Sequence, residues 1–174
     1  FAIFLGLTAL VVLFVVEIFV LLLMVVVLYG VLKTEKVGKV EIKEEDIVIN
    51  EEVKVKEETT MKGYRNVALF GVDSTSGELT KNTRSDSIMI ASINMDTGEC
   101  KIVSVYRDTY LNLGNDTYNK CNSAYAKGGP EQAINMLNMN LDMNITDFVT
   151  VGFAGLSDTI DALGGVMIDV DEAE

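Results

Sequence analysis

The chain has 174 residues, a formal net charge of −12, no histidine and no tryptophan. The acidic balance argues against a nucleic-acid partner, because contact with the phosphate backbone depends on an excess of lysine and arginine. The lack of histidine argues against His-based catalytic triads and most zinc sites. Aspartate, glutamate, arginine, lysine and tyrosine remain for chemistry, and this set suits Mg²⁺ and phosphate groups.

Residues 1–32 are almost entirely apolar and carry one charge, Glu17. About 20 apolar residues cross a bilayer as a helix. We therefore predict a transmembrane helix within residues 1–32, with a preferred span of about 11–32. A cleaved signal peptide fits less well, because the apolar run is too long and no A-x-A site follows it.

Residues 41–58 hold eight acidic and three basic residues. We interpret residues 33–65 as an acidic, solvated stalk between the membrane and a globular domain. Five β-branched residues in this stretch favour one short strand: Ile47, Val48, Ile49, Val53 and Val55.

Cys100 and Cys121 form no CxxC motif and no spacing typical of a metal site. We expect both to be small buried hydrophobic residues. A disulfide between them stays open, because the sequence does not give the distance between the two residues.

The globular part is predicted from residue 66 onward, as an α/β fold with a mixed β-sheet flanked by helices. Asp96 and Gly98 favour a tight hairpin turn, residues 73–85 and 107–120 suit polar loops, and Gly128-Gly129 suits a helix end. The methionines at 136, 139 and 143 are expected mainly to fill the core, although this run could also line an apolar cavity. Strands are expected at 67–72, 87–94, 101–106, 148–153 and 166–170, and helices at 122–127, 130–141 and 156–163.

Charged side chains stand where the predicted strands end. Asp73 follows the first strand, Arg84 and Asp86 lie at the start of the second, and Arg107-Asp108 follows the third. In a hairpin, the start of one strand and the end of the other lie at the same edge, so Asp86 and Arg107 should be close. Asp73 joins them if the first strand runs parallel to the third. Such a cluster could bind Mg²⁺ and a pyrophosphate, or consist of ordinary surface ion pairs.

Five segments, in order and spacing, resemble the LytR–CpsA–Psr (LCP) family from about residue 66 to 170. The resemblance implies an LCP-like α/β/α sandwich that holds a polyprenyl lipid in an apolar cavity. It also implies a Mg²⁺-dependent phosphotransferase that moves a glycopolymer, such as wall teichoic acid or capsular polysaccharide, from undecaprenyl pyrophosphate to peptidoglycan. The segments are 67–74 (VALFGVDS), 84–94 (RSDSIMIASIN), 102–110 (IVSVYRDTY), 120–131 (KCNSAYAKGGPE) and 147–166 (DFVTVGFAGLSDTIDALGGV).

The resemblance implies roles for the charged residues at the strand ends. Asp73 and Asp86 match aspartates associated with Mg²⁺. Arg84 and Arg107 match arginines that contact the pyrophosphate. Asp108 would orient Arg107 or take part in proton transfer.

Three further residues belong to the fourth segment of the resemblance. Lys120 matches a basic position near the lipid head group. Asn122 and Tyr125 either support the site or are purely structural. Tyr106 stands where many members have proline, and we expect little effect because the Arg107-Asp108 pair is intact.

The family's later arginine-rich segment would lie beyond Glu174. We therefore expect residues 66–174 to be the N-terminal part of the catalytic domain, and this part alone to be incomplete as an enzyme. Three other functions stay open: a lipid-pyrophosphate hydrolase, a non-catalytic module that binds wall polymer or lipid, and a membrane-bound regulator.

The resemblance implies a single-pass protein of the cell membrane with its domain outside the cell. The charges after the apolar run favour the opposite orientation, since basic residues flanking a span tend to stay in the cytoplasm. These residues are Lys33, Lys36 and Lys39.

Overall fold

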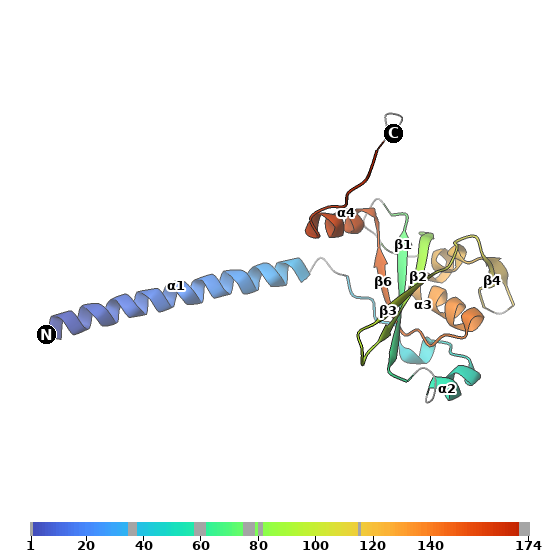
Figure 1. Ribbon diagram of the computed structural model, residues 1–174, viewed down its shortest axis with the longest axis horizontal. Coiled ribbons are helices and arrows are strands. Elements are labelled where there is room, and N and C mark those ends of the chain that lie inside the picture. Colours follow the sequence, from blue (N-terminus) through green and yellow to red (C-terminus); the bar gives the residue numbers. More distant parts are fainter. Residues whose placement is uncertain are drawn as a thin grey trace. The chain divides into compact units, whose positions relative to one another are not determined.

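The computed structural model describes residues 2–34, 38–57, 62–74, 79, 82–114 and 116–170. Lys36, Glu58 and residues 75–78, 80 and 81 of the predicted loop at 73–85 lie outside the described residues. The chain forms two compact units, Phe1–Glu41 and Ile42–Glu174, and each is described by itself. In chain order the elements are α1 (Ala2–Thr34), the 3₁₀ helix η1 (Glu44–Asp46), α2 (Glu51–Glu57), β1 (Tyr64–Val72), β2 (Ser85–Asn94), β3 (Cys100–Ser104), β4 (Tyr110–Asn112), β5 (Tyr118–Lys120), α3 (Asn122–Leu141), β6 (Asp147–Val151) and α4 (Phe153–Ala162) (Figure 1).

The first unit consists mainly of α1, a helix of 33 residues. Its segment Val12–Leu32 is long and apolar enough to cross a membrane. At 1.5 Å per residue, 21 helical residues rise about 32 Å, close to the thickness of a bilayer's hydrocarbon core. The segment agrees with the predicted span of about 11–32 and suggests a single-pass membrane protein.

The second unit is built on a four-stranded sheet with the order β3-β2-β1-β6. β2 is antiparallel to both β1 and β3, whereas β6 is parallel to β1. The predicted mixed sheet flanked by helices is therefore confirmed. β1 and β3 run in the same direction, so their C-terminal ends and the start of β2 lie at one edge of the sheet.

Gly71 allows the C-terminal end of β1 to approach β2 closely. A Cβ at this position would lie 2.9 Å from the Cβ of Ser87 on the neighbouring strand, so only glycine permits the close approach. The register of β1 and β2 shifts between Gly71 and Val72, which pairs Val72 with Ser85. This bulge changes the direction of the strand immediately before Asp73.

One face of the sheet packs against α3 and forms the core. Alternate residues of β1 point to this face, as the period of two in a strand requires. Met136 is fully buried and Met143 packs partly buried against the same cluster, which confirms their expected role as core filler. The buried residues from the sheet and α3 include Ala68, Phe70, Val72, Ile88, Ile90, Ala133, Ile134, Met136 and Leu137.

The segment after the membrane helix corrects the expectation of a stalk. Residues 42–57 belong to the compact second unit, and they form η1 and α2 in place of the expected strand. Val53 is fully buried. The Asn135 side chain accepts a hydrogen bond from Val48 N–H at 2.7 Å and donates one to Asp46 C=O at 3.0 Å. Apolar burial and these bonds outweigh the segment's charge, and the domain begins about 24 residues earlier than the predicted start at 66.

Three other expectations need correction. The two predicted helices at 122–127 and 130–141 form one element, α3, with a kink at Gly129, whose φ is 71°. Residues 166–170 are exposed and form no strand. The expected polar loop at 107–120 contains the hairpin β4–β5.

The two cysteines differ from each other. Cys121 is buried as expected, but Cys100 is exposed on β3, and both are free thiols. Cys100 lies on β3, which is an edge strand, and all five residues of this strand are exposed.

Candidate active site

A polar pocket of about 860 Å³ lies at the sheet edge where β1 and β3 end and β2 begins. All six charged residues singled out from the sequence line it, together with Asn122. The predicted proximity of Asp86 and Arg107 is confirmed, with Arg107 Nη1 2.9 Å from Asp86 Oδ1. The six charged residues are Asp73, Arg84, Asp86, Arg107, Asp108 and Lys120.

Asp108 forms ion pairs with two of the three cationic side chains of the pocket, Arg107 and Lys120. Its carboxylate lies 2.7 Å from Lys120 Nζ and 3.8 Å from Arg107 Nε. The hydrogen bond from Lys120, aided by the charges of Lys120 and Arg107, lowers the pKa of Asp108. Asp108 is therefore ionised at neutral pH and a weak proton acceptor. Of the two roles implied by the resemblance, the geometry favours the orientation of Arg107.

The backbone of Arg107 is fixed by the start of α3. Its carbonyl accepts hydrogen bonds from Asn122 N–H at 3.2 Å and from the Cys121 thiol at 3.3 Å. The same thiol lies 3.1 Å from the carbonyl of Tyr106, and Cys121 N–H donates to Thr109 C=O at 2.8 Å. Burial raises the pKa of the Cys121 thiol, so the sulfur keeps its proton and can donate. No pattern in the sequence indicated that a buried cysteine stabilises this turn.

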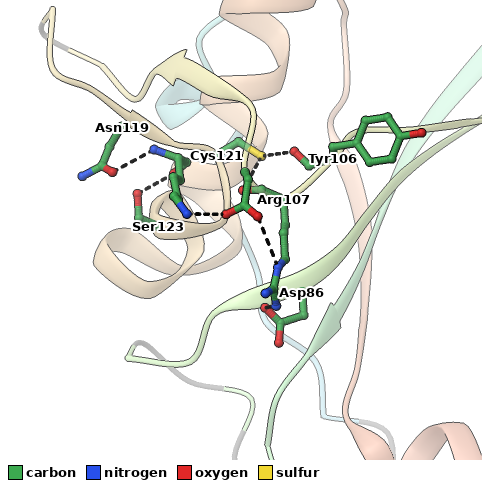
Figure 2. A network of polar contacts seen from close by, with 8 residues as sticks. Asp86, Tyr106, Arg107, Asn119, Cys121 and Ser123 are labelled. Carbon is green, nitrogen blue, oxygen red and sulfur yellow. Dashed lines mark hydrogen bonds and ion pairs between the residues drawn. The ribbon is translucent and has the colours of Figure 1, made fainter.

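Tyr106 does not disturb the charged pair. Figure 2 shows its ring directed away from Asp86 and Arg107, and the side chain is 86% exposed. Tyr106 therefore leaves the Arg107–Asp86 ion pair intact, as expected from the sequence.

Arg84, Asn122 and Tyr125 have different surroundings. Arg84 is exposed in the pocket, and no ion pair involves its guanidinium within the described parts of the chain. Asn122 is 7% exposed and lines the pocket floor. Tyr125 is buried in the core, where its ring meets Phe70 edge to face at 5.4 Å and its hydroxyl lies 3.1 Å from Thr150 Oγ1. Tyr125 is therefore part of the core, whereas Asn122 lines the polar pocket.

An apolar pocket of about 500 Å³ adjoins the polar one, on the face of the sheet opposite α3. Asp73 and Asp86 line both pockets, so the carboxylates stand at their boundary. The apolar residues that line this pocket were not predicted from the sequence. The signal was present, because β1 is apolar on both faces, as in a strand covered on both sides. The run 136–143 does not line the pocket. Its main apolar lining residues are Leu69, Met89, Val149, Phe153 and Leu156.

The donor set at the boundary fits Mg²⁺ held together with a phosphate. Mg²⁺ commonly takes one or two carboxylates, with waters and substrate phosphates as its other ligands. Asp73 and Asp86 supply two carboxylates in one pocket. Among the described residues, no group of three or more acidic, cysteine or histidine side chains could hold a metal without a substrate.

Comparison with known proteins places this geometry in a family. The sequence profile of the LytR_cpsA_psr family matches residues 27–174. The chain belongs to this family. The resemblance stated from five segments of the sequence is thereby confirmed.

Relatives of this LytR_cpsA_psr protein carry specific names. A protein of Oceanobacillus iheyensis, a polyisoprenyl-teichoic acid–peptidoglycan teichoic acid transferase TagU, is 33% identical over 110 residues, which are 60% of this chain and 33% of that protein. The structure of TagT bound to LIIa-WTA is 27% identical with a TM-score of 0.54, covering 64% of this chain and 41% of the other. The family protein YwtF (TagT) with bound octaprenyl pyrophosphate lipid is 26% identical, also with a TM-score of 0.54, covering 64% of this chain and 44% of the other.

The family member described here thus spans about a third of the TagU relative's length. The residues matched by the family, 27–174, contain the sheet, both pockets and all six charged residues of the polar pocket.

Proposed function

We propose that this LytR_cpsA_psr protein is a phosphotransferase that moves a glycopolymer from a polyprenyl pyrophosphate carrier to peptidoglycan. One observation carries the proposal: an apolar pocket and a charged pocket meet at two carboxylates. A lipid pyrophosphate has the same division, with an apolar chain next to an anionic head group. The names of the TagU relative and of the octaprenyl-pyrophosphate complex support this assignment.

The residues of the polar pocket bind and orient the head group. Arg84, Arg107 and Lys120 bind the pyrophosphate oxygens, and the planar guanidinium groups do so in bidentate fashion. Asp108 positions Arg107 and Lys120 through its two ion pairs. Asp73 and Asp86 would hold Mg²⁺, which would supply positive charge next to the pyrophosphate.

The reaction needs positioning and charge neutralisation more than proton transfer. A hydroxyl oxygen of peptidoglycan attacks the phosphorus that carries the glycan. The bond from this phosphorus to the bridging oxygen breaks, polyprenyl phosphate leaves, and the hydroxyl proton is released. Arg107 and Arg84 stabilise the negative charge on the transferred group.

The substrates determine the location of the domain. Peptidoglycan lies outside the membrane, so we propose that α1 anchors the protein in the cell membrane with the second unit outside. The wall teichoic acid ligand and the transferase name of the relatives favour wall teichoic acid over capsular polysaccharide as the cargo.

Two arginines of the chain allow a matched test. Arg107 and Arg65 are both about half exposed, and each lies 2.9 Å from an aspartate. Only Arg107 lines the polar pocket. With full-length protein in detergent, a lipid-pyrophosphate-linked oligosaccharide, peptidoglycan oligomers and Mg²⁺, Arg107→Ala should lower the transfer rate by about 10²–10³-fold, as loss of one transition-state donor does. Arg65→Ala should transfer at close to the wild-type rate.

The same assay separates the other functions. Release of glycan phosphate without peptidoglycan would indicate a hydrolase. Tight lipid binding without turnover would indicate a binding module. Transfer by Arg107→Ala at the wild-type rate would contradict the proposed site.

A further inference from the structure

We infer that Tyr110 and Tyr118, on the hairpin β4–β5, form a sugar-stacking platform beside the polar pocket. The platform would take a pyranose ring of the N-acetylhexosamine type. Its place in catalysis rests on the proposed function, whereas its binding of sugar does not.

The two rings stack on each other and both side chains stay largely exposed. Their centroids are 6.0 Å apart and their planes differ by 22°, and the side chains are 69% and 52% exposed. In the hairpin register Tyr110 pairs with Lys120, and Asn112 pairs with Tyr118. Residues paired across a sheet share a face, so both tyrosines lie diagonally on the face that carries Lys120.

The hairpin is held rigidly from its other side. Leu113 is 3% exposed in the core. The Asn140 side chain of α3 donates to Asn112 C=O at 2.7 Å and accepts from Asn112 N–H at 3.1 Å. The Gln132 side chain donates to Leu113 C=O at 3.2 Å. A surface fixed in this way loses little conformational entropy when it binds a ligand.

Lys120 connects the platform to the polar pocket. It is opposite Tyr110 in the hairpin, and its ammonium group lies 2.7 Å from Asp108 at the pocket. Asn119, next to Lys120, also lines the pocket. A group bound at the pocket would therefore place its next sugar units near the two tyrosines.

The chemistry of the face fits a sugar better than an apolar partner. The C–H groups on one face of a pyranose pack well against the electron-rich face of an aromatic ring. Tyrosine also offers a large contact area with few rotatable bonds. The neighbours of the rings on this face are Asn112 and Lys120, whereas the aliphatic Leu111 and Leu113 of the hairpin are turned to the core. Polar groups beside two exposed aromatic rings suit a ligand with one apolar face and a hydroxyl-rich edge.

The test uses the full-length protein in detergent and an uncharged tetramer of β-1,4-linked N-acetylglucosamine as the probe. Calorimetry gives the affinity, and comparison of the tyrosine variants with wild type assigns the binding to the two rings. The Tyr110→Ala/Tyr118→Ala variant should bind the tetramer at least about tenfold more weakly, the equivalent of about 1.4 kcal/mol. Tyr110→Phe/Tyr118→Phe should retain binding, because stacking needs the ring and not the hydroxyl. Tyr64→Ala is the control and should bind as wild type, because Tyr64 is at the start of β1 and the polar pocket lies at the end of β1.

Two further measurements separate this inference from the proposed function. Arg107→Ala should keep tetramer binding, and the double alanine variant should keep octaprenyl pyrophosphate binding. In the transfer assay, a raised KM for peptidoglycan assigns the platform to the acceptor strand, and a raised KM for the lipid-linked glycan assigns it to the donor. Tetramer binding through the tyrosines without any transfer would support the platform and refute the proposed function. Equal tetramer affinity of wild type and the double alanine variant, or no binding by either, would overturn the platform.

Discussion

Asn138 allows a sharp test of what holds the site-bearing sheet on α3. Its fully buried side chain donates to Ile145 C=O at 3.0 Å and accepts from Ile145 N–H at 2.8 Å. Ile145 is also fully buried and precedes β6, which pairs with β1. Asn138→Ala would leave two buried backbone groups without these partners.

The cost follows from the number of groups involved. Each buried backbone group without a partner costs about 1–3 kcal/mol, so the loss of two partners in Asn138→Ala should lower the free energy of unfolding by roughly 2–6 kcal/mol. The midpoint of thermal unfolding should fall by roughly 8–24 °C, since a domain of this size loses about 4 °C per kcal/mol. Near-UV circular dichroism during thermal unfolding in detergent would follow this change through buried Tyr125.

Asn135 is the matched control. It lies one helical turn earlier and makes the same kind of bonds, from one backbone N–H and to one backbone C=O. These groups are near the surface, where water can replace the side chain, so Asn135→Ala should cost below about 1 kcal/mol. Equal losses in the two variants would refute the argument from burial.

Three further predictions concern other parts of the second unit. The hydrogen bond and charge of Arg65 lower the pKa of Asp147. For a pair this exposed, the stabilisation is below about 1 kcal/mol. It is present above pH ~4 and should be lost as the pH falls through the lowered pKa of Asp147. The urea midpoints of wild type and Asp147→Asn should therefore converge at acidic pH. Under native conditions a maleimide should modify exposed Cys100 quickly and buried Cys121 only after unfolding, and equal rates would contradict the described packing. Phe153→Ala should weaken octaprenyl pyrophosphate binding about tenfold, since burial of a phenylalanine is worth about 1.5–3 kcal/mol, with little change in stability because the ring is 57% exposed.

The pattern of strand-end charges was readable from the sequence because hairpin geometry is local. The short turn at Asp96 and Gly98 determines how β2 pairs with β3, and that pairing brings Asp86 to Arg107. The sequence could not show whether β1 and β3 run in the same direction. The sheet order shows that they do, because β2 lies between them and is antiparallel to both.

Other parts depend on contacts between distant residues. Residues 42–57 pack through Ile42, Ile47 and Val53 and bond to Asn135, 87 residues away from Val48. The local charge of the segment indicated only that it is solvated. The hairpin β4–β5 is short and polar, and it is stabilised by Asn140 and Leu113 contacts that no local pattern shows. Residues 166–170 have an apolar strand pattern, but no neighbouring strand pairs with them in the described part of the chain.

In the proposed reaction, phosphorus travels with the glycan from the lipid to peptidoglycan. The most direct measurement uses full-length protein with Mg²⁺ and a lipid-pyrophosphate-linked oligosaccharide labelled with ³²P on the phosphate next to the glycan. In this reaction the label should become covalently bound to peptidoglycan, and polyprenyl monophosphate should appear in equal amount. Label released as soluble glycan phosphate, or retained entirely on the lipid, would contradict it.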